Sequence, residues 1–312
     1  MAIAERPFHG EADLPAVVEL RREIAAVTPG SLPVSESELR EKMLGPVPDW
    51  KQEYILWEED GSLDGMLEVH TSELPDSDPV VYLGARVRPV ARERGLGEVM
   101  IARGEELARQ WRGVGAELEI SSLRDSTWAV SLIERMGFVP ARVFERMAME
   151  LSAPVLPEPA ASGYYVRPLA GVDEVDAWNA VYNVAFRDHY DFHAITRQQR
   201  LRYMEQPSHV PELDLVAAAL DGSMAAFCWI IRRDEDDGGV TWVVDLVGTH
   251  PEHRRRGLAG ALISAGLAGI QERGGRRVLL EVDSNSPTGA NRLYERLGFR
   301  VETAMIDFRK RL

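Results

Sequence analysis

The chain has 312 residues, 45% of them hydrophobic, and a formal net charge of −14, which suits two soluble globular domains. The negative charge argues against a nucleic-acid partner, because such binding needs cations that neutralise phosphates. No apolar run reaches the length of a membrane helix, the N-terminus lacks a secretory apolar segment, and Cys228 has no second cysteine to pair with. We therefore expect a cytoplasmic protein with no membrane partner.

The first half begins with two helical patterns, at Asp13–Ala26 and Ser35–Leu44. Two strands follow, with a hairpin expected at Asp60-Gly61. Next come a strand, a long amphipathic helix at Gly95–Trp111, another strand, a short helix and a terminal strand. Mixed order with mostly hairpin-linked strands predicts an α+β fold, a sheet flanked by helices.

A proline-rich segment, residues 151–163, separates this half from the rest of the chain. Prolines remove backbone donors and keep a chain extended, so we expect a short, stiff linker. The predicted domains are therefore residues 1–150 and residues 164–312.

The second half repeats the plan of the first. Helical patterns occur at Val172–Ala185 and Thr196–Gln206, a hairpin signal at Asp221-Gly222 and a long helix at Gly257–Arg273. Pro89, Arg92 and Gly95 match Pro251, Arg254 and Gly257 at an offset of 162, and Leu132–Phe138 matches Leu293–Phe299 at an offset of 161. Two motifs in the same order at nearly one offset indicate an internal duplication.

The chemistry is expected at the glycine-bearing loop that precedes each long helix. A loop of this kind presents unpaired N–H groups and the positive end of a helix dipole, which suits a phosphate. Arg254, Arg255 and Arg256 add positive charge in the second copy. A dinucleotide-binding fold does not fit, because Met100 stands where a third glycine is needed after Gly95 and Gly97.

Arg254-x-x-Gly257-x-Ala259 and Arg92-x-x-Gly95-x-Gly97 resemble the pyrophosphate signature of the GNAT acyltransferase superfamily. The segment that ends at Phe299 is similar to the closing motif of that family. The resemblance covers nearly the whole chain. It implies two tandem GNAT folds, each a mixed, mostly antiparallel sheet whose central strands splay apart.

The resemblance also implies acetyl-CoA as cofactor and a small-molecule amine as acceptor. In the second copy, backbone groups of the motif strand would pair with the pantetheine arm, and loop amides would hold the pyrophosphate. The residues expected to contact the cofactor there are Leu246, Val247, Gly248, Thr249, Arg254, Arg255, Arg256, Gly257, Leu258, Ala259, Gly260, Asn285 and Asn291. The corresponding residues of the first copy are Val87, Arg92, Arg94, Gly95, Leu96 and Gly97.

Acetyl transfer to an amine needs a base for the ammonium group and an acid for the departing thiolate. The family motif makes Tyr294 the expected acid, and Ile133 replaces it in the first copy. Asp245 is the expected base, because it is a carboxylate in an otherwise apolar strand whose burial would raise its pKa. Its counterpart by offset, Leu83, cannot act as a base; His250 is an alternative base.

The segment that follows the first helix of the second copy is the expected acceptor site. His189 and His193 are four residues apart, with Asp188 and Asp191 nearby, so a metal site is the alternative. Since GNAT folds bind the acceptor between their first two helices, we expect His189, Tyr190 and His193 to contact substrate, and we expect no metal.

These observations predict an acetyl-CoA-dependent N-acetyltransferase whose second domain is catalytic and whose first domain is degenerate but able to bind CoA. The acceptor is left open between an aminoglycoside-like or other small amine and the cysteinyl amine of a sugar–inositol thiol precursor, which a tandem member of the family acetylates. A CoA-binding regulator without turnover is the alternative from another class. Either a monomer or a homodimer is compatible with the sequence.

Overall fold

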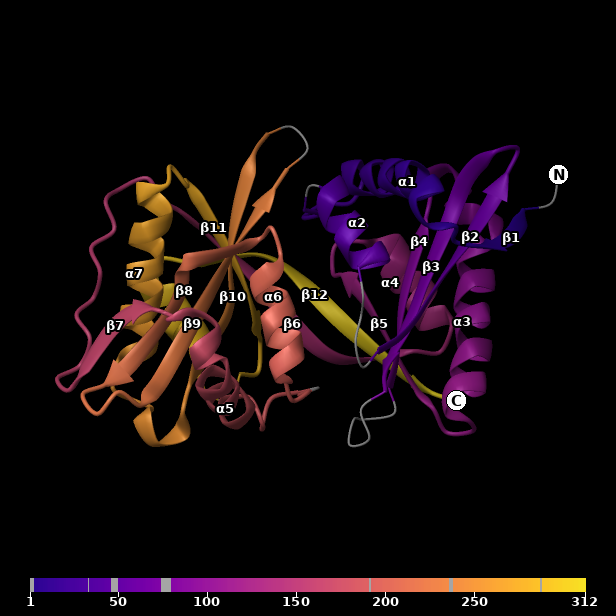
Figure 1. Cartoon of the computed structure of the whole chain (residues 1–312). Helices are drawn as coiled ribbons and strands as arrows, with labels where there is room; N and C mark the ends of the chain where they lie inside the picture. Colours follow the sequence, from indigo (N-terminus) through magenta and orange to yellow (C-terminus); the bar gives the residue numbers. More distant parts are fainter. Residues whose placement is uncertain are drawn as a thin grey trace. The chain divides into compact units, whose positions relative to one another are not determined.

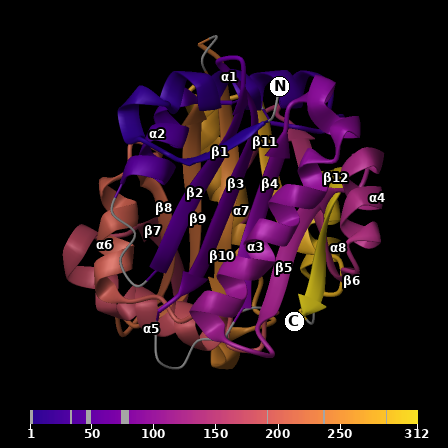
Figure 2. The same cartoon turned by 90° about the vertical axis from the view of Figure 1, so that its right-hand side faces the viewer.

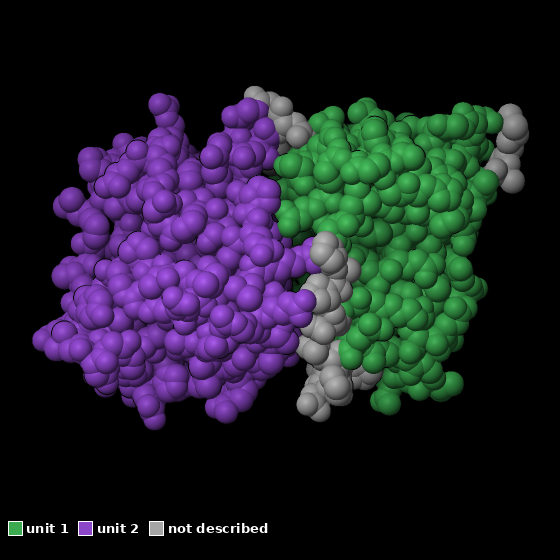
Figure 3. Space-filling model, in the orientation of Figure 1, with its two compact units in different colours: residues 1–144, 303–312 green, residues 145–302 purple. Residues whose placement is uncertain are grey.

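The computed structural model describes residues 3–32, 34–45, 50–73, 80–190, 192–235, 238–286 and 288–312. The chain divides into two compact units (Figure 3). Unit 1 comprises Met1–Phe144 and Thr303–Leu312, and unit 2 comprises Glu145–Glu302.

Unit 1 has six strands in the order β1-β2-β3-β4-β5-β12, in which only β4 and β5 form a parallel pair. Its elements are β1 (Ala4–Pro7), η1 (Gly10–Ala12), α1 (Leu14–Ala26), α2 (Glu36–Leu44), β2 (Trp50–Glu59), β3 (Ser62–Ser72), β4 (Val80–Val87), η2 (Pro89–Arg94), α3 (Leu96–Arg112), β5 (Glu117–Leu123), α4 (Thr127–Arg135) and most of β12 (Arg300–Arg311).

Unit 2 has the strand order β6-β11-β10-β9-β8-β7, with β10 and β11 parallel (Figure 1). Its elements are the end of β6 (Val139–Glu150), then β7 (Tyr164–Pro168), η3 (Gly171–Glu174), α5 (Val175–Ala185), α6 (Arg197–Glu205), β8 (His209–Ala219), β9 (Met224–Asp234), β10 (Val240–Thr249), η4 (Pro251–His253), α7 (Leu258–Glu272), β11 (Arg277–Asp283) and α8 (Ala290–Leu297). The predicted α+β class and the mixed, mostly antiparallel sheets are confirmed.

Helices cover both faces of each sheet. In unit 2, α7 and α8 pack on one face over a core that includes Cys228 and Leu262, whereas α5 and α6 pack on the other over Trp178 and Phe227. Unit 1 has the same arrangement, with α3 and α4 on one face and α1 and α2 on the other; Figure 2 shows α3 in front of its sheet. Each sheet is therefore buried on both sides, which explains its long apolar strands.

The second helix of each unit begins at a capping residue that the sequence already marks. Ser35 accepts a hydrogen bond from the backbone N–H of Glu38, and Thr196 forms a reciprocal capping box with Gln199. These side chains satisfy amides that the first helical turn leaves unpaired. The helix starts are thus fixed by local chemistry in both copies.

The terminal strand differs from the predicted domain boundaries. Met305–Arg311 of β12 pairs antiparallel with β5 and belongs to unit 1, although it follows the second copy in the sequence. In exchange, residues 145–150 of β6 belong to unit 2. Each copy therefore ends with a strand that completes the other unit's sheet, which a repeat pattern cannot reveal because either strand suits either sheet.

The segment predicted as a linker, residues 151–163, packs along unit 2. Gln271 of α7 donates to the carbonyls of Leu151 and Ala153, and the backbone N–H of Glu158 donates to the Ser264 hydroxyl at 2.7 Å. The Glu158 carboxylate also pairs with Arg296 of α8. This segment is part of the packing of unit 2.

Among the helices of the described residues, none has the length and apolar character required to cross a membrane.

Candidate active site

The central strands of unit 2 part halfway along their length. β10 pairs with β11 from Trp242–Val278 to Val244–Leu280 and no further. Beyond that point, residues 246–249 pair with β9 on one edge only. Among the described residues no strand pairs with the other edge, as an extended ligand such as a pantetheine arm requires.

Asp245 lies at the point where the strands part, as an extra residue in β10. Val244 pairs with Ile230 and Leu246 pairs with Trp229, so Asp245 has no partner and forms a β-bulge. Side chains of a regular strand alternate between its two faces, and the bulge takes Asp245 out of that alternation. It also ends the ladder at the site where chemistry is expected.

The strand register corrects the expected counterpart of Asp245. In unit 1, Leu83 pairs with Val69 and Gly84 with Glu68, without a bulge. Since Val69 corresponds to Ile230, Leu83 corresponds to Val244, and Asp245 has no equivalent in unit 1. Upstream of this point the two copies align at an offset of 161, as Asp60-Gly61 and Asp221-Gly222 do, and downstream of it at 162, as Gly95 and Gly257 do. Asp245 is the residue that adds one to the offset.

The surroundings of Asp245 disfavour its charged form. The side chain keeps access to solvent, yet the protein packed around it raises its pKa to about 6. Desolvation is the main cause; the nearby Glu281 adds to it, whereas Arg233 and Arg200 oppose it. A carboxylate in this range is ionised at neutral pH and is basic enough to accept a proton.

Aromatic side chains of the helical face surround Asp245, and the sequence reasoning missed them. Burial raises the pKa values of Tyr182 on α5 and Tyr203 on α6, and the negative charge of Asp245 raises both further. Tyr203 contacts Trp229 at a ring distance of 5.5 Å, and Trp229 lies opposite the bulge. These residues come from three separate elements, so no local motif marks them.

A buried arginine supports this aromatic group. Arg200 of α6 is 0% exposed, pairs with Asp214 and lies between the rings of Trp178 and Trp229 at 4.1 and 4.7 Å. Nε and Nη1 of Arg200 have no partner among the described residues. The sequence places Arg200 within an otherwise polar helix, where a solvent-exposed arginine is the ordinary expectation.

Tyr294 lies on the opposite face of the sheet from this aromatic group. It is a residue of α8, only 8% exposed, and belongs to the core on the α7 face. Burial raises the pKa of its phenol, so the hydroxyl keeps its proton at neutral pH. Ile133 of unit 1 is 3% exposed and has no proton to donate.

The loop before α7 forms an open cradle. Gly257 has φ of +72° and caps the helix, and a Cβ added there would meet nothing within 4 Å. Arg255 also adopts a left-handed conformation, with φ of +61°. The amides of Leu258, Ala259 and Gly260 lie in the first turn, where they lack helical partners.

The arginines of this loop are not neutralised. Arg254 donates to the carbonyls of Thr249 and Ala185, and Arg256 lies over the ring of Tyr164. Arg254, Arg255 and Arg256 form no ion pair with a carboxylate among the residues that the structure describes. The loop therefore presents uncompensated positive charge where a pyrophosphate is expected.

The corresponding loop of unit 1 is more occupied by its own side chains. Arg94 pairs with Glu59 at 2.6 Å, and Arg92 lies over the ring of Trp128. Gly95 keeps the left-handed cap, with φ of +79°, before Leu96. A Cβ at Gly97 would lie 2.4 Å from Leu132, so this glycine serves helix packing. Val87 is 3% exposed and paired with Gly65.

The predicted acceptor residues follow α5. His189 contacts the Phe186 ring at 4.6 Å, and His189, Tyr190 and His193 are all partly buried. Asp191, a carboxylate between His189 and His193 in the sequence, lies outside the described residues. Phe186 in turn lies 3.1 Å from where a Cβ of Gly248 would be, so this segment reaches the C-terminal end of β10.

The remaining predicted residues lie in loops or on α8. The side chain of Asn291 donates to Glu145, and the backbone of Asn285 donates to Asp283. His250 caps η4, and its possible ligand atoms lie within 4.8 Å of those of Glu252 and His253. Since Nδ1 of His253 bonds the Tyr164 hydroxyl at 2.8 Å, this group already has a structural role.

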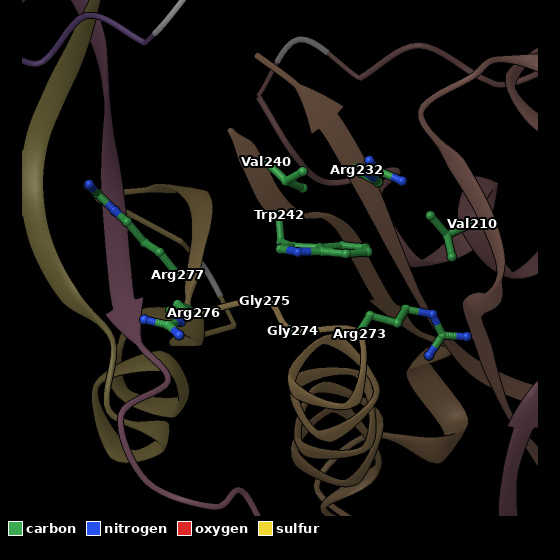
Figure 4. A pocket seen from close by; sticks show the side chains of 9 residues that line it. All are labelled: Val210, Arg232, Val240, Trp242, Arg273, Gly274, Gly275, Arg276 and Arg277. Carbon is green, nitrogen blue, oxygen red and sulfur yellow. The ribbon is translucent and has the colours of Figure 1, made fainter. Parts of the chain in front are cut away.

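A cavity of about 650 Å³ opens at the other end of β10 (Figure 4). Trp242 forms its floor beside Gly274 and Gly275, and the side chains of Arg276 and Arg277 extend away from that ring. The β10 residues that line it are Val240 and Trp242, and its lining includes neither Asp245 nor a residue of the α7 loop. The cavity is therefore separate from the candidate active site.

A model of the acetyltransferase (GNAT) family matches residues 17–138 and 178–299. The mycothiol acetyltransferase of Thermobispora bispora is 30% identical over 300 residues, covering 96% of both chains. That of Kineococcus radiotolerans is 33% identical over 256 residues, covering 80% of this chain and 79% of its own.

Two solved structures share the whole fold. The GCN5-related N-acetyltransferase from Sphaerobacter thermophilus has a TM-score of 0.80 at 25% identity and covers 99% of this chain and 95% of its own. A tandem GNAT protein from the clavulanic acid biosynthesis pathway has a TM-score of 0.82 at 15% identity, with coverage of 99% and 98%. The chain thus belongs to the acetyltransferase (GNAT) family, as an acyltransferase with two tandem GNAT domains.

Proposed function

We propose that this protein is an acetyl-CoA-dependent N-acetyltransferase that acts on the primary amine of a small molecule, with its active site in unit 2. The observation that carries the proposal is the free edge of β10, which runs from the Asp245 bulge to the uncompensated arginine loop. An extended thioester with a pyrophosphate at one end matches this order of bulge, free strand edge and arginine loop.

The residues suit a direct transfer. Acetyl-CoA, when bound, supplies the thioester carbonyl that the amine attacks. Asp245 accepts a proton from the incoming ammonium group, directly or through a water, and the raised pKa places it in the working range of a base. Tyr294 donates its phenolic proton to the departing thiolate from the opposite face of the sheet.

The test is release of free thiol from acetyl-CoA with a panel of small amines. Turnover with at least one amine, and none without an amine, is expected. If the protein binds acetyl-CoA tightly but no amine gives turnover, the alternative of a CoA-binding regulator replaces this proposal. Mass spectrometry of the intact protein with its co-purified CoA would then count the CoA molecules bound per chain.

Replacement of Tyr294 by Phe tests the assignment of the acid. The variant keeps the ring contact with Phe299, at 6.2 Å, and loses only the hydroxyl. We expect kcat to fall by about 10²-fold with nearly unchanged acetyl-CoA affinity. Tyr164→Phe is the matched control, because it also removes one phenolic hydroxyl, in this case the one that bonds His253. Equal rates for wild type and Tyr294→Phe would remove Tyr294 from the mechanism.

The relatives favour one acceptor within this class. Relatives named mycothiol acetyltransferase align with nearly all of this chain. We therefore place the cysteinyl amine of a sugar–inositol thiol precursor first in the amine panel, and aminoglycoside-like amines second. A kcat/KM for the thiol precursor no higher than for the other amines would exclude it as the preferred acceptor.

A further inference from the structure

The cavity at the start of β10 has a lining whose charge contrasts with that of the whole chain. Of the nine described residues that line it, four are arginines and none is acidic, although the chain has a net charge of −14. The rest of the lining is apolar or glycine, and the volume of about 650 Å³ is that of a small-molecule site. An apolar floor with cations beside it suits a ligand that is both apolar and negatively charged.

Two of the four arginines border the space beside the Trp242 ring. Figure 4 shows the side chains of Arg232 and Arg273 on either side of Val210, above and below that ring, whereas the other two arginines extend away from it. Arg232 is the cross-strand partner of Trp242, and Arg273 is the residue that ends α7. A strand and a helix end therefore place two guanidinium groups at one cavity.

Unit 1 closes the corresponding place with one of its own side chains. By the register of the two sheets, Thr71 of β3 corresponds to Arg232 of β9. Arg112, the last residue of α3, donates from Nε and Nη2 to the Thr71 hydroxyl at 3.0 and 2.8 Å, which joins the helix end to the sheet. In unit 2 an arginine replaces the threonine. Two guanidinium groups carry only donors and repel each other, so this closure is lost and the cavity stays open.

The two guanidinium groups at the cavity each have a carboxylate partner at the protein surface. Arg232 pairs with Asp234 at 2.7 Å, and Arg273 pairs with Glu212 at 3.5 Å. The two carboxylate side chains are 57% and 64% exposed, and exposed ion pairs contribute little to stability. A guanidinium also has more N–H donors than one carboxylate uses. Both arginines can therefore bind a ligand anion beside these partners or in their place.

We propose that this cavity binds an aromatic carboxylate, whose charged group lies between Arg232 and Arg273 and whose ring lies on the floor formed by Val210, Val240 and Trp242. The guanidinium fork matches a carboxylate through paired N–H donors, and its plane also stacks on aromatic rings. A rigid ring fills an apolar floor with little loss of conformational entropy. The cavity shares no residue with the proposed acetyl-transfer site, so binding here is independent of turnover.

Calorimetric titration of the full chain with 2-naphthoate tests the proposal. Saturable binding is expected, at least about tenfold tighter than that of 2-naphthamide, which has the same ring without the charge. Octanoate, which has the carboxylate without a ring, should also bind more weakly than 2-naphthoate. Absence of saturable naphthoate binding, or equal affinity for either comparison ligand, would overturn the proposal.

The arginine variants test where the carboxylate binds. Arg232→Met and Arg273→Met should each weaken naphthoate binding by about tenfold or more. Arg103→Met is the matched control, because Arg103 of α3 also pairs with partly exposed carboxylates, Glu5 and Glu106, but lies in unit 1. This variant should bind naphthoate as wild type does.

Val240→Trp tests the cavity itself without changing a charge. Val240 is 38% exposed, so the strand tolerates a larger side chain, which would occupy the space of the ligand ring. Loss of naphthoate binding with an unchanged circular dichroism spectrum is expected. If an arginine variant fails to fold, this variant decides alone. Naphthoate binding that persists in Val240→Trp would place the ligand elsewhere and refute the proposed site.

Discussion

Asp245 combines a functional demand with a cost to the fold. The residue interrupts a strand pair, keeps a charge in crowded surroundings and has a pKa raised to about 6. A raised carboxyl pKa means that the folded state holds its proton more tightly than the unfolded chain does. The charge therefore destabilises the fold above that pKa, whereas the proposed chemistry requires it.

Asp245→Asn should separate these two effects. We expect turnover to fall by about 10²–10⁴-fold, because the base is lost. In wild type, kcat/KM should rise with pH through about 6 as Asp245 ionises, and the variant should lack that rise. A pH–rate profile that still rises near this pH in Asp245→Asn would assign it to another group.

The same variant should be more stable at high pH. Wild type loses stability as pH increases from the ordinary carboxyl pKa to about 6, so the difference is complete above that window and absent below it. Thermal unfolding at pH 8 should therefore show a higher Tm for Asp245→Asn, and unfolding at pH 4 should show little difference. A lower Tm at pH 8 would mean that the carboxylate has a structural partner.

At the level of elements, the helix starts and the glycine caps could be predicted because their causes are local. Ser35 and Thr196 mark helix starts by their side-chain oxygens, and Gly95 and Gly257 stand where φ is positive. The bulge could not be assigned to Asp245 from the sequence. A change of offset between the two copies shows that one residue is inserted somewhere between two matching motifs, but not which residue it is. The aromatic acceptor face was missed because its residues meet only through packing.

Deletion of Asp245 tests the role of the bulge. The deletion should give β10 the regular register of β4, so the protein folds, but turnover is lost by more than about 10²-fold. Deletion of Val243 has the same length but moves Asp245 into the buried place of Val244, and it should unfold unit 2. Equal unfolding of both variants by circular dichroism would contradict this register.

The two capping glycines form a matched pair. Gly257 and Gly95 have φ of +72° and +79°, and neither site has an atom within 4 Å of an added Cβ. Gly257→Val and Gly95→Val should thus strain the backbone equally, by about 1–2 kcal/mol. Only Gly257→Val should raise the KM for acetyl-CoA, by about tenfold or more, because its side chain would block the cradle. A similar KM increase in Gly95→Val would place a functional cofactor site in unit 1.

At the scale of the whole molecule, the exchanged terminal strands decide where a local change is felt. Phe299 and Phe308 are both 0% exposed and lie nine positions apart in the chain, yet Phe299 belongs to the core of unit 2 and Phe308 to that of unit 1. The proximity of two residues in sequence is therefore no guide to the unit they stabilise.

Phe299→Ala and Phe308→Ala should each destabilise one unit by about 3–5 kcal/mol. Hydrogen exchange should show lost protection in β9 and β10 for Phe299→Ala, and in β4 and β5 for Phe308→Ala. Loss in the same strands for both variants would refute the exchange of strands.

The exchange also sets an order of assembly during synthesis. The ribosome releases residues 1–144 before unit 2, but their sheet lacks the strand Met305–Arg311 until those residues are translated. Unit 1 therefore begins to emerge before unit 2 and is completed after it. A stop codon before residue 305 would damage the unit that was synthesised first, and a gene split at the proline-rich segment would leave both units incomplete.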